Sequence, residues 1–174
     1  MSIALPLLGE RVQLRRLAET DLADFQAYRR DVEVARYQGW EPRSDDWALA
    51  FLREMAAAPL LEAGQWCQLG IAERQSNRLI GDIGLCRHAE AVEIGFSLAR
   101  PSQGLGLAFE AMQLLIDEAL APHPVIAITD ARNVACLRLL GRLGLQQVAT
   151  ERAMFRGQPC LEHKYRLERA TLRL

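Results

Sequence analysis

A glycine-containing stretch in the middle of the chain carries residue types that suit phosphate binding. It reads Gln103-Gly104-Leu105-Gly106-Leu107-Ala108. Without Cβ atoms, the backbone at its two glycines can approach a ligand closely. The first turn of a helix that follows would offer unpaired N–H groups at the positive end of the helix dipole. Together these features can bind a phosphate or pyrophosphate group without any lysine.

Two regular elements must position this stretch. Residues 92–98 form a short apolar run that ends before Arg100-Pro101, which predicts a buried strand. From Leu107 to Leu120 the apolar residues recur at helical spacing with polar residues between them. The glycines therefore occupy the turn of a predicted strand–turn–helix unit.

Three phosphate-binding patterns can be compared with the turn. A P-loop requires a lysine after its glycines, and none follows here. A dinucleotide fingerprint requires a third glycine, for close helix–strand packing, where Phe109 stands. The third pattern, Q/R-x-x-G-x-G/A, is matched by Gln103, Gly106 and Ala108. In this respect the turn resembles the acetyl-CoA pyrophosphate loop of the GNAT N-acetyltransferase superfamily, and an ordinary glycine-rich connection is the alternative.

A second segment of the same superfamily follows in the expected order. Residues 125–129 predict a strand that leads into a helix with Val134, Leu137 and Leu140 on its apolar face. Asn133 suits the N-cap of this helix, and Gly144 can end it in a left-handed conformation. The segment resembles N-x-x-S-x-x-L-x-x-x-x-G-F, with Cys136 in place of the usual serine.

The start of the chain extends the resemblance. A strand is predicted near residues 10–17, and two helices follow, the second of them capped by Ser44. This opening is similar to the ribosomal-protein N-terminal alanine acetyltransferases, at Arg11, Leu14, Arg15, Asp21, Tyr37, Gly39, Trp40 and Pro42. In that branch the early helices and their loop line the acceptor side. Tyr37 and Trp40 therefore become candidate substrate contacts, with anchoring of a long loop as the alternative.

The remaining pattern predicts one α/β domain over residues 1–174, with its core at about 10–168. Residues 65–73 and 78–86 predict an antiparallel hairpin, and further strands are predicted at 146–150 and 160–167. The resemblance implies a single-domain GNAT-like fold, with a mixed, mostly antiparallel sheet splayed at the cofactor strand and helices on both faces.

Composition limits the partners. The 174 residues are 50% hydrophobic and 25% charged, with a net charge of −1, which gives no electrostatic reason to expect nucleic acid. No apolar run is long enough to span a membrane, and no signal peptide is recognised, so a cytoplasmic location is expected. Four cysteines without a C-x-x-C pair predict free thiols and no metal. A homodimer formed through the late strands is a further possibility.

The resemblance implies which residues hold the acetyl donor, acetyl-CoA. The strand backbone at Phe96, Ser97 and Leu98 would pair with the pantetheine arm like an added strand. Residues 103–108 would bind the pyrophosphate, and Asn133 and Cys136 would line the cofactor site.

The same resemblance implies direct attack of a primary amine on the acetyl carbonyl in a ternary complex. A protonated amine cannot attack, so Glu93 is the candidate to contact the amine and accept its proton, with a solvated strand residue as the alternative. Cys136 or Tyr165 would protonate the departing thiolate, although a thiol is a weaker donor than a hydroxyl. A non-catalytic CoA-binding or sensing module is the alternative function. The acceptor is left open among protein N-termini, amino sugars, polyamines, amino acids and antibiotics.

Overall fold

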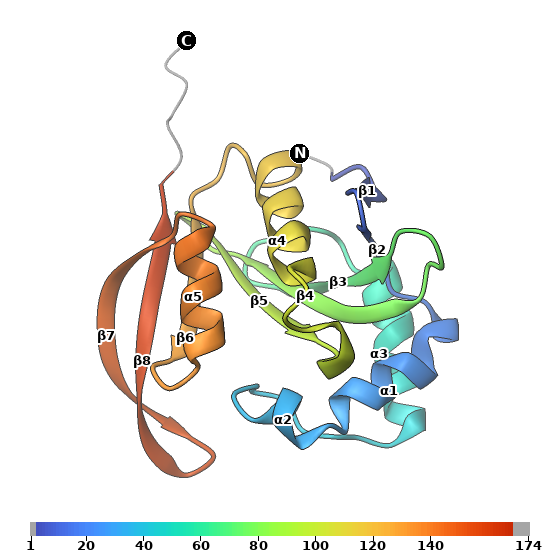
Figure 1. Ribbon diagram of the computed structural model, residues 1–174, viewed down its shortest axis with the longest axis horizontal. Helices are drawn as coiled ribbons and strands as arrows, with labels where there is room; N and C mark the ends of the chain where they lie inside the picture. The colour runs from blue at the N-terminus through green and yellow to red at the C-terminus, as the bar shows by residue number, and fades with distance from the viewer. Residues whose placement is uncertain (1–2, 169–174) are drawn as a thin grey trace.

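The computed structural model describes residues 3–168, which fold around one twisted, open sheet (Figure 1). Within this range eight strands lie in the order β1-β2-β3-β4-β5-β6-β8-β7. Their bounds are β1 Leu7–Leu8, β2 Val12–Arg16, β3 Trp66–Glu73, β4 Leu79–Arg87, β5 Val92–Leu98, β6 Val125–Asp130, β7 Gln146–Phe155 and β8 Gln158–Leu167. Among these eight strands, only β5 and β6 pair in parallel.

Helices cover both faces of the sheet (Figure 1). The helices are α1 Leu22–Arg29, α2 Val32–Ala35, α3 Asp45–Ala57, α4 Leu107–Glu118 and α5 Val134–Arg142. The larger core cluster packs α4 and α5 against the sheet, and Met112, Leu115 and Leu140 are fully buried in it. A smaller cluster on the opposite face joins α1 and α3 through Phe25, Tyr28 and Leu52. The two periodic patterns thus bury their apolar stripes on opposite sides.

The sheet opens between β5 and β6. Their pairing covers only Val92↔Val125 and Glu93↔Ile126, although β5 continues to Leu98. Beyond Glu93 the edge of β5 that faces β6 therefore lacks a neighbouring strand. This confirms the predicted splay at the cofactor strand.

Local signals place the helix ends as expected. The Ser44 hydroxyl accepts a hydrogen bond from Trp47 N, and the Asn133 side chain accepts one from Cys136 N. Gly144 takes a left-handed conformation, φ 85°, directly after α5. The predicted apolar face of α5 was wrong at Val134, which is 52% exposed. The helix is rotated so that Cys136, Leu139 and Leu140 face the core instead.

The last hairpin is longer than its sequence pattern predicts. β7 runs to Phe155 rather than to residue 150, and β8 starts at Gln158, so that only residues 156 and 157 turn. Pro159 is accommodated inside β8 because β6 pairs only with residues 162–167 of that strand. At Pro159 the edge of β8 that faces away from β7 has no neighbouring strand. The N–H that proline lacks is therefore not needed for a sheet hydrogen bond there.

Candidate functional site

The predicted phosphate loop is a left-handed turn that leads into α4. Gly104 and Gly106 have φ of 74° and 79°, in a backbone region that residues with a Cβ atom rarely adopt. Gly106 is the N-cap of α4 and no side chain caps the helix, so the N–H groups of its first turn have no side-chain acceptor. A Cβ atom at Gly104 would meet no atom within 4 Å. The loop therefore offers an open, positively polarised surface that suits a pyrophosphate.

A clamp between Arg11 and Glu110 fixes this loop to β2. Arg11 Nη1 donates to the carbonyl of Leu105 at 2.8 Å, and Arg11 Nε donates to Glu110 Oε2 at 2.9 Å. Glu110 Oε1 accepts from the backbone N–H groups of Arg11 and Val12. Burial raises the pKa of Glu110, but the hydrogen bonds from Arg11 and Val12 outweigh it and lower the pKa below its usual value. Arg11, a position matched in the resembled family, thus positions the loop.

The free edge of β5 carries polar backbone groups that point into the splay. Gln38 Nε2 donates to the Phe96 carbonyl at 3.1 Å, and Gln103 Nε2 donates to the Leu98 carbonyl at 2.8 Å. In a strand the N–H and C=O of one residue point to the same side, so the N–H groups of Phe96 and Leu98 also face the gap. Gln103 therefore closes the strand end by its side chain, beside the loop.

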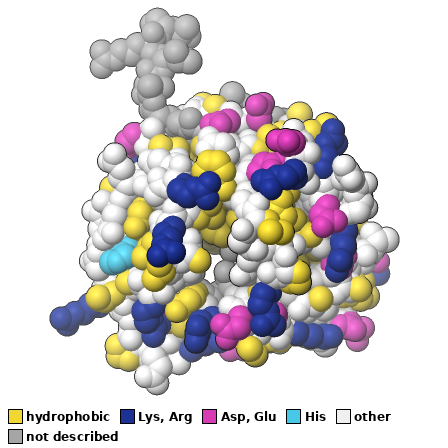
Figure 2. All heavy atoms as spheres, in the orientation of Figure 1, with side chains coloured by type: hydrophobic (Ala, Val, Ile, Leu, Met, Phe, Trp, Pro, Cys, Tyr) yellow, Lys and Arg dark blue, Asp and Glu magenta, His cyan; other side chains and the backbone are white. Residues whose placement is uncertain are grey.

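The splay opens to the surface as a hollow. Figure 2 shows it near the centre of the view, by the first turns of α4 and α5, with Lys or Arg side chains over α5 beside it. The basic residues of α5 are Arg138 and Arg142, and the Arg142 guanidinium lies 4.5 Å from the ring centre of Phe109 in α4. Cations near the start of α4 add to the attraction for a polyanionic ligand.

Ile94, Phe96 and Leu98 of β5 belong to the larger core cluster, and the other face of the strand carries Glu93, Gly95 and Ser97. Glu93 Oε2 lies 2.8 Å from His88 Nε2, and the side chains of Glu93 and His88 are 21% and 46% exposed. A Cβ atom at Gly95 would meet nothing within 4 Å. Ser97 is buried and pairs in register with Asp82. The open space at Gly95 lies next to the Glu93 carboxylate, so an amine could approach β5 at this point.

Asn133 and Cys136 lie together at the start of α5. The amide oxygen of Asn133 accepts from Cys136 N at 3.3 Å, so this side chain is a helix cap in the structure. Burial raises the pKa of the Cys136 thiol, while a hydrogen bond with the Thr129 side chain lowers it in part. The thiol is consequently protonated at neutral pH and can donate a weak hydrogen bond.

The remaining predicted residues divide between two regions. Tyr165 packs against the core, and its hydroxyl donates to Gln147 of β7 at 3.5 Å, which directs it toward the outer strand. Tyr37 donates to the Arg132 carbonyl at 3.4 Å, next to the cap of α5. Trp40 lies in the loop before α3, 4.3 Å from the Arg29 guanidinium. Tyr37 and Trp40 thus belong to one loop near the splay, and Tyr165 does not point there.

Three further residues in this region were not among the site residues predicted from the sequence. His88 sits at the β4–β5 turn, Gln38 in the loop after α2, and Arg156 in the last hairpin. Only Arg156 carried a signal, because arginine is unusual in front of glycine in a tight hairpin turn. The other two depend on contacts between distant segments.

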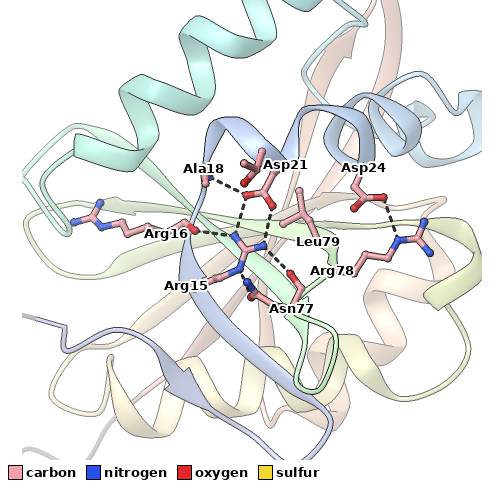
Figure 3. A pocket seen from close by; sticks show the side chains of 9 residues that line it. Arg15, Arg16, Ala18, Asp21, Asp24, Asn77, Arg78 and Leu79 are labelled. Carbon is pink, nitrogen blue, oxygen red and sulfur yellow. Dashed lines mark hydrogen bonds and ion pairs between the residues drawn. The ribbon is translucent and has the colours of Figure 1, made fainter.

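A separate pocket near the β3–β4 turn is lined by charged side chains, most of which pair with one another (Figure 3). Arg15 donates to both carboxylate oxygens of Asp21 and to the side chain and carbonyl of Asn77. Arg78 pairs with Asp24 in the same pocket. The cluster therefore ties β2, α1 and the β3–β4 turn together and is a structural feature.

Within residues 3–168, no group of three or more His, Cys, Asp or Glu side chains is arranged to hold a metal ion. No helix in this range combines the length and apolar character needed to cross a bilayer.

Comparisons with known proteins agree with this geometry. Residues 11–146 match the acetyltransferase (GNAT) domain family. The chain belongs to the GNAT family. This GNAT protein is 29% identical over 147 residues to the uncharacterized N-acetyltransferase p20 of Bacillus licheniformis, covering 81% of this chain and 82% of the relative. Family membership supports an acetyl-CoA-dependent N-acetyltransferase.

Solved structures share the GNAT fold at low identity. A GNAT-family acetyltransferase from Bacillus anthracis superposes with a TM-score of 0.81 at 18% identity, over 94% of this chain and 98% of that chain. RimL, a ribosomal alpha-N-protein acetyltransferase solved in complex with coenzyme A, gives a TM-score of 0.82 at 14% identity, over 95% and 99%. The single-domain α/β GNAT fold with a mostly antiparallel sheet is thereby confirmed.

Proposed function

We propose that this enzyme acetylates the α-amine of a protein N-terminus, by direct attack of the amine on acetyl-CoA in a ternary complex. The observation that carries the proposal is the free edge of β5 at the splay, which leads directly into the loop at residues 103–108. Similarity to the fold of a ribosomal alpha-N-protein acetyltransferase supports a protein acceptor.

The chain holds the donor along one continuous path. The backbone N–H groups of Phe96 and Leu98 face the splay and are placed to pair with an amide-bearing arm, while their carbonyls accept from Gln38 and Gln103. The left-handed loop and the first turn of α4 would bind the pyrophosphate, with Arg142 nearby. The described residues therefore fit acetyl-CoA, which supplies the activated acetyl group.

Glu93 is proposed to accept the amine proton. It lies beside the open position at Gly95, on the face of β5 that the acceptor would reach. His88, hydrogen-bonded to Glu93 and half exposed, gives that proton a path to solvent. An N–H group of Phe96 or Leu98 would stabilise the negative charge that develops on the carbonyl oxygen.

Cys136 is proposed to protonate or hydrogen-bond the departing thiolate. Its raised pKa keeps the proton on sulfur at neutral pH. Tyr165 is the weaker candidate, because its hydroxyl is engaged by Gln147.

Thermal unfolding with and without acetyl-CoA tests the donor site. At a hundredfold excess over Kd, binding adds about 2.7 kcal/mol, which raises the Tm by roughly 5–10 °C for a chain of this size. The wild type and Gly64→Trp should show the shift, and Gly104→Trp should not. The two glycines are matched, since both have φ 74° and neither Cβ position meets an atom within 4 Å. An equal shift in both variants would refute the assigned loop.

Mass spectrometry of a mixed set of N-terminal peptides and small amines tests the acceptor. The proposal predicts acetylation at the peptide α-amine, with a conventional lysine side chain left unmodified. Turnover of small amines alone would overturn the assigned acceptor while leaving the donor site in place.

A further inference from the structure

A pocket of about 290 Å³ lies between the loop that precedes α3 and the tip of the β7–β8 hairpin. Its walls combine aromatic rings with charged side chains, namely Gln38, Gly39, Trp40, Glu41, Arg43, Trp47, Phe155 and Arg156. In Figure 2 basic side chains also predominate along the lower edge of the molecule, where α2 and the following loop lie. The mechanism proposed above gives this pocket no role.

Arg156 holds the pocket together at the cost of an unfavourable backbone. It has φ 49° and precedes Gly157 at φ 75°, a turn in which asparagine or aspartate is usual at the first position. Its Nη2 donates to the carbonyls of Ala35, Gln38 and Trp40 at 3.1–3.4 Å. The hairpin and the loop are therefore joined by one guanidinium group. Strained residues of this kind concentrate at ligand sites.

Gln38 connects the pocket to the reaction centre. Gln38 lines the pocket, its backbone carbonyl accepts from Arg156 Nη2 at 3.4 Å, and its side chain donates to the Phe96 carbonyl on the free edge of β5. One glutamine side chain therefore spans the distance from the pocket to the strand on which the acetyl group would lie. That distance corresponds to one or two residues of extended peptide, at about 3.5 Å each.

The charge of the pocket favours an anion. Among residues 3–168, neither Arg43 nor Arg156 forms an ion pair, and Glu41 is the one acidic residue in the lining. Arg43 and Arg156 lie over the rings of Trp47 and Phe155, with guanidinium-to-centroid distances of 5.9 and 5.1 Å. Asp45, just beyond the pocket, is already paired with Arg30. The lining of the pocket thus holds two guanidinium groups, of Arg43 and Arg156, and one carboxylate, of Glu41.

We propose that this pocket binds a carboxylate side chain at the second or third position of the acceptor N-terminus, which makes acidic N-termini the preferred substrates. The inference rests on the proposed function, since it assumes a peptide acceptor. The guanidinium groups of Arg43 and Arg156 bind the carboxylate through charge-assisted hydrogen bonds, and the rings of Trp40 and Trp47 shield it from water.

Binding and turnover of three peptides separate this inference from the proposed function. The peptides begin Ser-Glu-Glu, Ser-Gln-Gln and Ser-Lys-Lys and are otherwise identical. Affinity is measured by tryptophan fluorescence with coenzyme A present, and turnover by kcat/KM with acetyl-CoA. The acidic peptide should bind and react about three- to tenfold better than the neutral one, and the preference should weaken as salt is raised.

Arg43→Gln should abolish the preference for the acidic peptide while leaving the neutral peptide unaffected. Arg156→Gln should weaken binding of all three peptides, because its guanidinium joins the hairpin to the loop. Arg43→Lys should retain much of the preference. Arg152→Gln, an exposed position on β7 outside the pocket, is the matched charge control and should behave as wild type. Thermal unfolding confirms that each variant is folded.

Equal affinity for the acidic and neutral peptides would overturn the inference, whatever the turnover. So would a preference that survives Arg43→Gln. Selective binding of the acidic peptide without acetylation of any peptide would instead support the pocket and refute the proposed acceptor reaction.

Discussion

Replacement of Glu110 tests the clamp that holds the phosphate loop. In Glu110→Ala the N–H of Val12, a fully buried residue, loses its acceptor, which costs about 1–3 kcal/mol. Loss of the ion pair with Arg11 adds at most about 1 kcal/mol, because the Arg11 side chain is 49% exposed and screened by water. The expected decrease in the free energy of unfolding is therefore about 1–4 kcal/mol. Glu110→Gln keeps one acceptor oxygen and should lose about 1 kcal/mol.

The loop should also lose order. Without the carboxylate, Arg11 is no longer fixed where it donates to the Leu105 carbonyl. We expect acetyl-CoA affinity to fall roughly three- to tenfold in Glu110→Ala, because the loop must be ordered on binding. Denaturant unfolding and titration calorimetry measure the two effects separately.

The pH dependence has a definite sign. The pKa of Glu110 is lower in the folded protein than in the unfolded chain, so its carboxylate contributes stability above the unfolded pKa of about 4.3. That contribution disappears as pH falls through the folded pKa. The stability difference between wild type and Glu110→Gln should thus be largest near pH 7 and vanish in acid. A difference independent of pH, or a Glu110→Ala variant as stable as wild type, would refute the clamp.

Three further changes address the chemistry. Gly95→Leu should lower kcat/KM for the amine at least about tenfold with the Kd of acetyl-CoA unchanged, because the side chain would fill open space on the acceptor face; a selective loss of acetyl-CoA binding would contradict this. Glu93→Gln should reduce kcat about 10²-fold, whereas His88→Gln should reduce it less; an unchanged kcat in Glu93→Gln would exclude Glu93 as the base. Cys136→Ser should keep or raise kcat and Cys136→Ala should lower it, since the hydroxyl is the better donor, and equal rates in all three proteins would remove Cys136 from the acid role.

Sequence alone determined the elements whose signals are local. The glycines of residues 103–108 predicted a turn, and Ser44 and Asn133 marked helix starts, because caps and turns depend on a few neighbouring residues. The strand–turn–helix order around the loop, and with it the family resemblance, followed from the same local patterns. The residues proposed to bind the donor could therefore be named before the fold was known.

Only the tertiary structure shows the features that depend on contacts between segments far apart in the chain. The rotation of α5, which exposes Val134 and partly buries Cys136, is set by packing on the sheet and not by helical periodicity. The contacts of Gln38 with β5, and of Arg156 with the loop before α3, join residues far apart in the chain. Helical periodicity and capping residues do not predict such contacts, because these patterns involve only residues that are close together in the sequence. The donor loop was thus predictable from sequence, while the proposed acceptor pocket emerged only when the sheet brought its walls together.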